Sequence, residues 1–252
     1  MDLGLAGKVI LVTGGAKNVG REIARTLAAE GARLAITYLS SKQEAKITAD
    51  QARAAGAADV LTFRNDVTDY AAVQALVAEI GGRLGPIDVL INNAGVGRFG
   101  RFLESAPADW RPVIETDLYG VMNCTHAVLP SMVERRSGRI ITIIGDSGRV
   151  GESGLATTAA ARGGGVAFSK SVAKEVGRFG VTVNAVSLGV LKGEGLDHLW
   201  DPASEERVTQ MYALRRLGTP RDPAGLVALL ASEWAGWITG QTISVSGGFS
   251  MV

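Results

Sequence analysis

Short apolar runs alternate with longer stretches of helical periodicity from one end of the chain to the other. Several runs are apolar at nearly every position, which is typical of strands that are covered on both faces. Seven runs are predicted to be strands: residues 9–12, 33–38, 60–63, 89–92, 140–144, 181–186 and 243–245. Six stretches are predicted to be helices: residues 20–30, 42–54, 68–80, 115–134, 158–177 and 222–231. This strict alternation predicts an α/β fold with a seven-stranded, parallel, doubly wound sheet and helices on both faces.

Local signals mark some helix ends and one long loop. Gly31 and Gly56 follow two predicted helices as stop signals, and Thr68 begins a third helix as its N-cap. The longest irregular stretch, residues 189–220, follows the sixth strand, where a loop is placed to cover a ligand at the carboxyl ends of the strands. The chain contains no internal repeat. Residues 1–252 are therefore predicted to form one domain, with 189–220 as a substrate loop or lid.

Length, charge and cysteine content exclude several protein classes. The chain has 252 residues, and 46% of them are hydrophobic, which is enough for one large core. The 26 basic side chains nearly balance the 25 acidic ones, which argues against nucleic acid as a partner. No apolar run approaches the ~18 residues that span a bilayer, and the opening residues do not resemble a signal peptide. With Cys124 as the one cysteine, we expect a soluble, cytoplasmic protein with no membrane partner and no metal site.

A glycine-rich turn joins the first predicted strand to the first predicted helix. It reads TGGAKNVG (13–20), and such a turn lets backbone N–H groups approach a pyrophosphate at the positive end of the helix. Two further polar motifs, NDVTD (65–69) and NNAG (92–95), follow the third and fourth strands. Because the carboxyl ends of parallel strands lie at one edge of a sheet, the three motifs are expected to meet where a dinucleotide binds.

Together with the closing ITGQTISVSGG (238–248), these motifs resemble those of the short-chain dehydrogenase/reductase family over essentially the whole chain. The resemblance implies a single Rossmann-type dinucleotide-binding domain, an oxidoreductase acting on carbonyl or hydroxyl groups, and a homotetramer or homodimer. It also implies a set of cofactor-binding residues: Gly14, Lys17, Asn18, Val19, Gly20, Tyr38, Ser40, Asp66, Val67, Asn92, Ala94 and Gly95. One of them, Asn18, stands where the family has its middle glycine; Asn tolerates left-handed backbone better than most residues.

The residues after the second strand indicate which dinucleotide is bound. NAD-binding proteins usually place an acid there to hold the ribose 2′-hydroxyl. This chain has Tyr38, followed by Leu39, Ser40 and Ser41. Lys17 matches a position that is often basic in NADP-dependent family members, although a solvated loop charge also explains it. We therefore expect NADP(H) to be favoured over NAD(H).

The resemblance breaks down at the positions that carry the family's chemistry. Family members use a Ser, a Tyr and a Lys, usually supported by an Asn, and the Tyr hydroxyl passes a proton to the substrate oxygen. Alignment with this pattern puts Gly145 at the Ser, Thr158 at the Tyr and Arg162 at the Lys, while Asp117 takes the Asn position. An aliphatic hydroxyl is a far weaker acid than a phenol, and an arginine stays charged. We expect the usual proton relay to be absent.

Residues beside these positions are candidates to replace the lost chemistry. Asp146 and Ser147 directly follow the missing Ser and can reach a substrate if the loop is reshaped, although their sequence also suits an ordinary turn. An unpaired cation in a cleft is costly, so Arg162 is expected to meet Asp117, Asp146 or an anionic ligand. The catalytic candidates are thus Asp117, Asp146, Ser147, Thr158 and Arg162.

Further departures and candidates lie after the sixth strand. Leu188 replaces a family Pro, and Gly193 replaces the Thr that commonly contacts the nicotinamide carboxamide. His198 and Tyr212, in the long loop, can supply acid–base groups, but a mobile surface loop explains them equally well. Tyr119 is expected to pack in the core, because it lies on the helix face opposite Asp117.

Three functions remain open at this point. The chain is an atypical NADP(H)-dependent oxidoreductase with a non-standard proton donor, a lyase, isomerase or hydrolase on the same scaffold, or an inactive nucleotide-binding member. The motifs expected to bind the adenine end of a dinucleotide still match the family, and we therefore favour the first of these functions. Residues 148–154, GRVGESG, faintly resemble those of family members that act on acyl thioesters, so an acyl thioester is one candidate among carbonyl or hydroxyl small molecules, and the substrate stays open.

Overall fold

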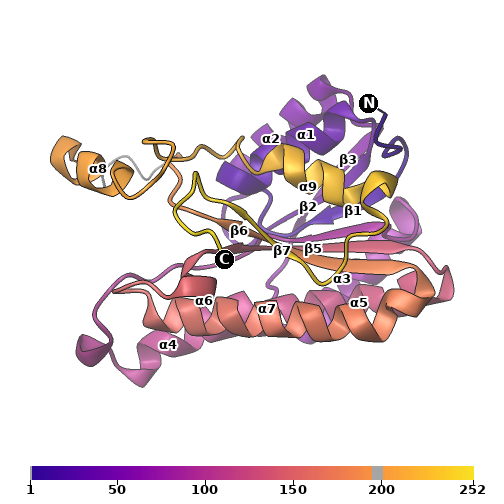
Figure 1. Cartoon of the computed structure of the whole chain (residues 1–252). Coiled ribbons are helices and arrows are strands. Elements are labelled where there is room, and N and C mark those ends of the chain that lie inside the picture. The colour runs from indigo at the N-terminus through magenta and orange to yellow at the C-terminus, as the bar shows by residue number, and fades with distance from the viewer. Residues whose placement is uncertain (1, 195–200) are drawn as a thin grey trace.

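The sheet has seven parallel strands, as the sequence pattern predicts. The computed structural model describes residues 2–194 and 201–252, and the strands run in the order β3-β2-β1-β4-β5-β6-β7 (Figure 1). Their bounds are β1 Val9–Val12, β2 Arg33–Tyr38, β3 Asp59–Arg64, β4 Val89–Asn92, β5 Gly138–Gly145, β6 Val181–Leu188 and β7 Thr242–Val245. All neighbouring strands are parallel. The strand order reverses between β1 and β4, and such a switch point opens a crevice at the carboxyl ends.

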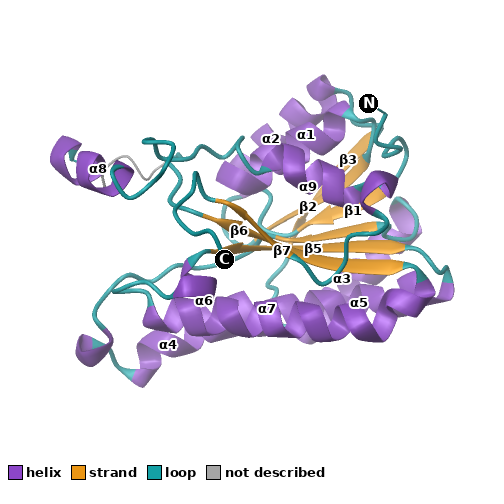
Figure 2. Ribbon diagram, in the orientation of Figure 1, coloured by secondary structure: helices purple, strands orange, loops and turns teal. Residues whose placement is uncertain are grey.

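Helices cover both faces of the sheet (Figures 1 and 2). One face carries α1 Asn18–Ala29, α2 Lys42–Ala55 and α9 Ala224–Ala231, and the other carries α3 Tyr70–Arg83, α5 Gly120–Glu134 and α7 Ala156–Val176. Shorter helices that the sequence pattern does not predict are α4 Pro107–Ile114, α6 Ser147–Val150 and α8 Pro202–Thr209. The predicted fold class, a single Rossmann-type α/β domain, is confirmed.

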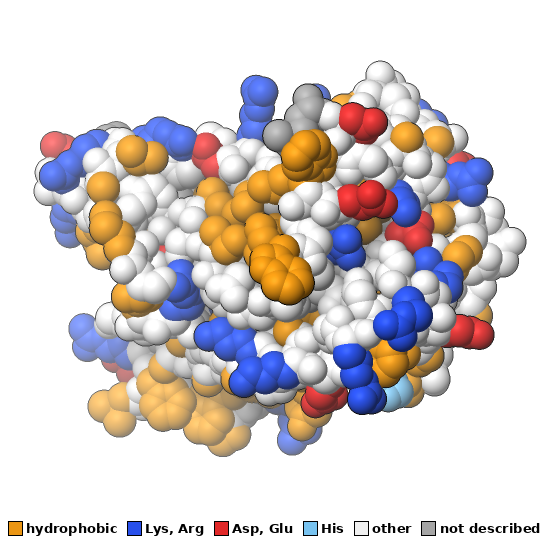
Figure 3. All heavy atoms as spheres, turned by 45° about the vertical axis from the view of Figure 1, so that its right-hand side comes forward, with side chains coloured by type: hydrophobic (Ala, Val, Ile, Leu, Met, Phe, Trp, Pro, Cys, Tyr) orange, Lys and Arg blue, Asp and Glu red, His pale blue; other side chains and the backbone are white. Residues whose placement is uncertain are grey.

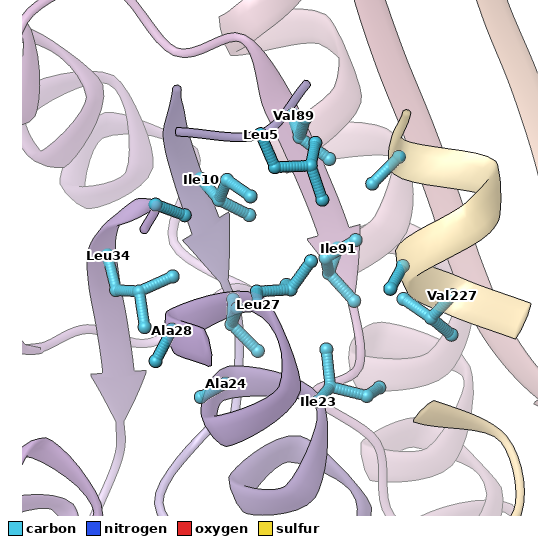
Figure 4. Packing of buried hydrophobic residues seen from close by; sticks show 14 of the residues in the cluster. Leu5, Ile10, Ile23, Ala24, Leu27, Ala28, Leu34, Val89, Ile91 and Val227 are labelled. Carbon is cyan, nitrogen blue, oxygen red and sulfur yellow. The ribbon is translucent and has the colours of Figure 1, made fainter. Parts of the chain in front are cut away.

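Successive residues of β1 face opposite layers, which explains why the strand is apolar throughout. Val9 and Leu11 pack among the residues of α3, α5 and α7, whereas Ile10 and Val12 pack among those of α1 and α9. Figure 4 shows the cluster that contains Ile10, where Leu27 of α1 lies between Ile10 and Ile91, and Val227 of α9 lies on the side of Ile91. A strand buried on both faces needs an apolar side chain at every position.

The first turn of α3 differs from the prediction. Asp69, and not Thr68, is the N-cap, and its carboxylate accepts the N–H of Ala72 at 3.0 Å. Thr68 instead donates its N–H and its hydroxyl to Oδ1 of Asp66, at 2.9 and 2.8 Å. Both residues can cap a helix, so the sequence alone did not separate them. Gly56 ends α2 with a left-handed φ of 115°, as predicted.

The helix predicted over residues 115–134 is interrupted. α4 passes into a π-helical stretch, Glu115–Tyr119, before α5 begins. Such π turns are rare and often occur at functional sites. Asp117 is buried in this stretch, whereas Tyr119 is 54% exposed. The prediction that Tyr119 packs in the core is therefore wrong.

Residues 189–220 leave the sheet after β6 and return before α9. A bridge between Leu191 and Gly218 closes the base of this segment, and α8 extends from the body of the molecule (Figure 1). His198 lies outside the described residues. Tyr212 is buried, with 3% of its surface exposed. The role of the segment as a lid stays a prediction.

The surface carries charges of both signs. Basic and acidic side chains are interspersed on the face shown in Figure 3, in keeping with the net charge of +1. None of the described helices is long and apolar enough to cross a bilayer. Within the same residues, His, Cys, Asp and Glu side chains form no group of three or more that could hold a metal ion.

Candidate functional site

A hollow of about 420 Å³ lies at the carboxyl ends of β1 to β4. The structure gathers these predicted cofactor-binding residues around it: Gly14, Lys17, Asn18, Val19, Gly20, Tyr38, Ser40, Asp66, Val67, Ala94 and Gly95. Asn92 lies beneath the hollow, buried, and donates to the hydroxyl of Thr125 at 3.2 Å. Asn93 lines the hollow instead, and the repeated Asn of NNAG is the signal that could have pointed to it.

Thr13 ties the glycine turn to the motif after β4. Its hydroxyl donates to the carbonyl of Ile91 at 3.3 Å and accepts the N–H groups of Asn93 and Ala94, both at 3.0 Å. The two segments approach so closely that a Cβ on Gly14 would lie 2.9 Å from Cα of Ala94. Gly14 also has a φ of 60°, which favours glycine. The turn therefore fits the tight backbone cradle that a phosphate needs.

The departure at Asn18 is accommodated by the departure at Gly193. Asn18 has a φ of 50°, the left-handed backbone that Asn tolerates. Its Oδ1 lies 2.6 Å from the position that a Cβ on Gly193 would take. The side chain of Asn18 thus fills the space that any residue larger than glycine would need at position 193. The two changes are coupled, although the chain separates them widely.

The end of β2 leaves room for a charged group on the ribose. Tyr38, Ser40 and Ser41 line this side of the hollow, and Lys17 is exposed beside them. Among the described residues that line the hollow, Asp66 is the one acid. Its carboxylate is already engaged by Thr68, so it is directed into its own turn. The local charge is compatible with a 2′-phosphate.

Arg162 meets an acid, as the sequence predicts, and that acid is Asp117. Nε of Arg162 in α7 lies 3.5 Å from Oδ2 of Asp117 in the π-helical stretch. The other carboxylate oxygen accepts the N–H of Val96 at 2.7 Å. Burial raises the pKa of Asp117, and the bond from Val96 and the charge of Arg162 oppose this rise without cancelling it. The pair lies at two of the four positions 117, 145, 158 and 162, where the family that the sequence resembles has its Asn, Ser, Tyr and Lys; these four positions are called the centre of the site.

Two glycines make room for Arg162. A Cβ built on Gly145, at the end of β5, would overlap Nη1 of Arg162 and lie 3.2 Å from its Cζ. A Cβ on Gly148 would lie 2.6 Å from Cβ of Arg162. The guanidinium therefore takes the volume that a side chain at 145 would need.

Thr158 does not present a free hydroxyl to the centre. Its side chain is buried, with 1% of the residue exposed. Its Oγ1 lies 3.4 Å from both the N–H and the carbonyl oxygen of Arg98. The hydroxyl is thus engaged with the backbone of the segment after β4.

Asp146 and Ser147 are not placed to reach a substrate. Asp146 is 2% exposed, and the hydroxyls of Ser187, Ser250 and Ser244 donate to it at 2.5, 2.6 and 3.0 Å. Burial alone would raise the pKa of this carboxyl, but the surrounding serine hydroxyls lower it below its ordinary value. Ser147 is buried as well. Asp146 therefore joins the ends of β5, β6 and β7 and is not the open carboxylate that the sequence suggested.

Asp146→Asn is expected to reduce the free energy of unfolding by about 1 kcal/mol near neutral pH, because bonds to a charged acceptor become bonds to a neutral one. The folded-state pKa of Asp146 is depressed, so its contribution is present above the unfolded-state pKa and is lost as pH falls through the folded value. The difference in free energy of unfolding between the variant and the wild type should therefore shrink at acidic pH. Denaturant unfolding at neutral and acidic pH measures this difference, and the exposed Asp50→Asn is the control. A difference that grows at acidic pH would contradict the stabilising role of the Asp146 carboxylate.

Two more titratable groups lie at this end. The hydroxyl of Tyr212 accepts the N–H of Val190 at 2.8 Å, and burial raises its pKa, which makes it a poor proton donor. Glu152, which the sequence reading overlooked within GRVGESG, is half-buried. Burial raises its pKa, while the charge of Arg162 opposes the rise.

Comparison with known proteins agrees with this architecture. Residues 14–250 match a family model described as Enoyl-(Acyl carrier protein) reductase. The chain is 39% identical over 244 residues to the 3-oxoacyl-[acyl-carrier-protein] reductase FabG of Staphylococcus aureus (strain N315), which covers 97% of this chain and 98% of that protein. It is also 39% identical over 246 residues to FabG of Escherichia coli (strain K12), which covers 98% of each chain. The predicted resemblance is confirmed, and the chain belongs to the short-chain dehydrogenase/reductase family.

Proposed function

We propose that this chain is an NADP(H)-dependent oxidoreductase that acts on the carbonyl group of an acyl thioester through an altered proton relay. The observation that carries the proposal is the contrast between the two ends of the site. The hollow beside β1 to β4 retains the glycine turn and its tie to Thr13. The centre beyond it holds the Arg162–Asp117 pair over Gly145.

The nucleotide end supports the choice of cofactor. When bound, NADPH supplies a hydride to the carbonyl carbon. The N–H groups of the glycine turn would hold its pyrophosphate, as they do at other helix N-termini that follow such turns. Lys17 and Ser40 would hold the 2′-phosphate, because both line the hollow where β2 ends without an acid.

The similar proteins support the substrate class. Those from Staphylococcus aureus and Escherichia coli are named as reductases of 3-oxoacyl groups on acyl carrier protein. The matching family model is also described by an acyl-carrier-protein substrate. A 3-oxoacyl thioester is therefore the substrate class that we propose for this chain.

The altered relay is supported by three side chains at the centre. Thr158 is engaged with Arg98, and Arg162 cannot share a proton at ordinary pH. Asp117 has a raised pKa, so it holds a proton to higher pH than an ordinary Asp. We assign the proton-holding role to Asp117, with the adjacent guanidinium of Arg162 orienting an oxygen of the substrate.

A second candidate function, nucleotide binding without catalysis, is favoured by one specific observation. The Arg162–Asp117 pair already satisfies both charges, and its guanidinium occupies the space that a serine side chain at position 145 would need. Steady-state turnover of a 3-oxoacyl thioester separates the two candidates, since only the oxidoreductase consumes NADPH.

NADPH is expected to bind at least about tenfold more tightly than NADH. Lys17→Ala should weaken NADPH binding about tenfold, the effect of losing one charge-assisted bond to phosphate, and leave the affinity for NADH unchanged. Titration calorimetry of both nucleotides measures this. Lys42→Ala is the matched control, because Lys42 is exposed at the start of α2 and does not line the hollow. Equal affinity for the two nucleotides would refute the NADP(H) assignment.

A homotetramer or homodimer remains part of the proposal. Apart from Arg162, residues 159–165 of α7 are Ala or Gly, and such small residues let another helix approach closely. Gly163 and Gly164 are partly exposed on that helix. Light scattering that gives the mass of one chain would exclude both assemblies.

A further inference from the structure

The segment after β6 lies directly on the glycine turn. Nδ2 of Asn18 lies 3.5 Å from the carbonyl oxygen of Glu194, and the side chain of Asn18 fills the space beside Gly193. The carboxylate of Glu194 pairs with the guanidinium of Arg21, in the first turn of α1. Residues of the late loop therefore occupy the same helix end that forms one wall of the hollow.

Arg21 holds its place by other bonds. Its Nε donates to the hydroxyl of Thr48 at 2.9 Å, and its Nη2 donates to the carbonyl of Ala16 at 3.1 Å. The Arg21 side chain is 10% exposed, whereas the Glu194 side chain is 61% exposed. Glu194 thus reaches from the surface to a cation that the turn and α2 already fix.

This contact sets a negative charge beside an anion-binding helix end. The N-terminus of α1 and the N–H groups of the turn attract anions. The carboxylate of Glu194, which pairs with Arg21 in the first turn of this helix, weakens that attraction and repels a second anion. Because the Glu194 side chain is exposed, solvent and salt limit the effect to a modest size.

We propose that the carboxylate of Glu194 opposes pyrophosphate binding at the glycine turn by its charge, which we call its competitor role, so that it lowers affinity for dinucleotides without lowering affinity for the adenosine 2′-phosphate half. The proposal rests on the proposed NADP(H) function, since it places a pyrophosphate at the glycine turn. It assigns to this chain a residue that discriminates between a dinucleotide and its adenosine end.

A charge-neutral replacement tests the proposal. Glu194→Gln should tighten NADPH binding about two- to fivefold, as expected for removing one exposed charge near a helix end, and leave adenosine 2′-monophosphate unchanged. Glu205→Gln is the matched control. It removes the same charge from the same loop region, where Glu205 pairs with Lys192 at 2.6 Å and not with Arg21. This control should leave the affinity for both ligands unchanged. Titration calorimetry measures these affinities for the wild type and the two variants.

Each other outcome has a definite meaning. NADPH affinity that stays the same or falls in Glu194→Gln overturns the competitor role, as does an equal gain in Glu205→Gln. A gain for adenosine 2′-monophosphate as large as that for NADPH also overturns it. If Glu194→Gln tightens NADH and NADPH alike while NADH is the tighter ligand, the competitor role stands and the NADP(H) assignment fails.

Discussion

Gly145→Ser is expected to lower the free energy of unfolding by about 1–3 kcal/mol, the cost usually seen when atoms are added to a filled space. The added Cβ would overlap Nη1 of Arg162 and come within 3.2 Å of Cζ. Arg162 has little freedom to withdraw. Its own Cβ packs on Gly148, and its Nε lies 3.5 Å from Asp117.

Arg162→Lys on the same background should recover most of this loss. Lysine ends in one compact ammonium group and lacks the rigid plane that fills the space over Gly145. The two substitutions should therefore be non-additive, with a coupling of about 0.5–3 kcal/mol. Thermal unfolding of wild type, both single variants and the double variant measures it, and in a chain of this size 1 kcal/mol corresponds to about 2–4 °C.

Gly97→Ser provides the control for adding a side chain to a glycine of the same site. A Cβ on Gly97 meets nothing within 4 Å, so this variant should unfold like wild type. A Gly145→Ser variant as stable as wild type would mean that Arg162 moves away easily. A double variant no better than the single variant would show that the space is limited by something else.

The sequence predicts most of this fold because its strands are buried on both faces. Continuous apolar runs such as residues 9–12 exclude a strand with one polar face, and the alternation with helices then leaves few topologies. Local details are less determined. Asp69 and Thr68 are both good N-caps, and the π turn before α5 depends on packing around Asp117, which helical periodicity does not report.

The candidate site is predictable in its nucleotide half and less so in its chemical half. The glycine turn and NNAG are local motifs whose backbone geometry follows from their own residues. The volume shared by Gly145 and Arg162, or by Asn18 and Gly193, joins residues that are distant in the chain. Alignment reports each as a separate loss, whereas the structure shows pairs of compensating changes. The surroundings of Asp146 are likewise not visible in its local sequence, since its serine partners come from other strands and the C-terminal residues.

Restoring all three family residues, as Gly145→Ser/Thr158→Tyr/Arg162→Lys, is expected to raise NADPH-dependent reduction of a 3-oxoacyl thioester by about 10²–10⁴-fold. That range is the usual contribution of a positioned acid. Wild type lacks such an acid at 158, since Thr158 is buried and engaged with Arg98. The triple variant also removes the guanidinium that would exclude a side chain at 145.

A phenol ring at 158 must displace part of the segment that covers it. Residues 95–100 are exposed and contain no helix or strand, so the segment can shift at modest cost. Near Asp117 and Thr158, the segment is held by the bond from Val96 to Asp117 and by the 3.4 Å contacts of Arg98 with Thr158. Of these two ties, the variant loses only the Arg98 contacts and keeps the bond from Val96 to Asp117.

Gly145→Ser/Thr158→Phe/Arg162→Lys is the matched control, because it differs from the active design by one hydroxyl group. Steady-state assays of wild type, the triple variant and this control then isolate the proton donor. Wild-type turnover of about 1 s⁻¹ or more would show that the Asp117–Arg162 pair already works as a relay. If the Tyr and Phe variants are equally slow while NADPH still binds, the relay is not what limits the site. The remaining departures from the family, Asn18 and Gly193 beside the glycine turn, would then explain the low activity. Nucleotide binding without catalysis would become the better account of this chain.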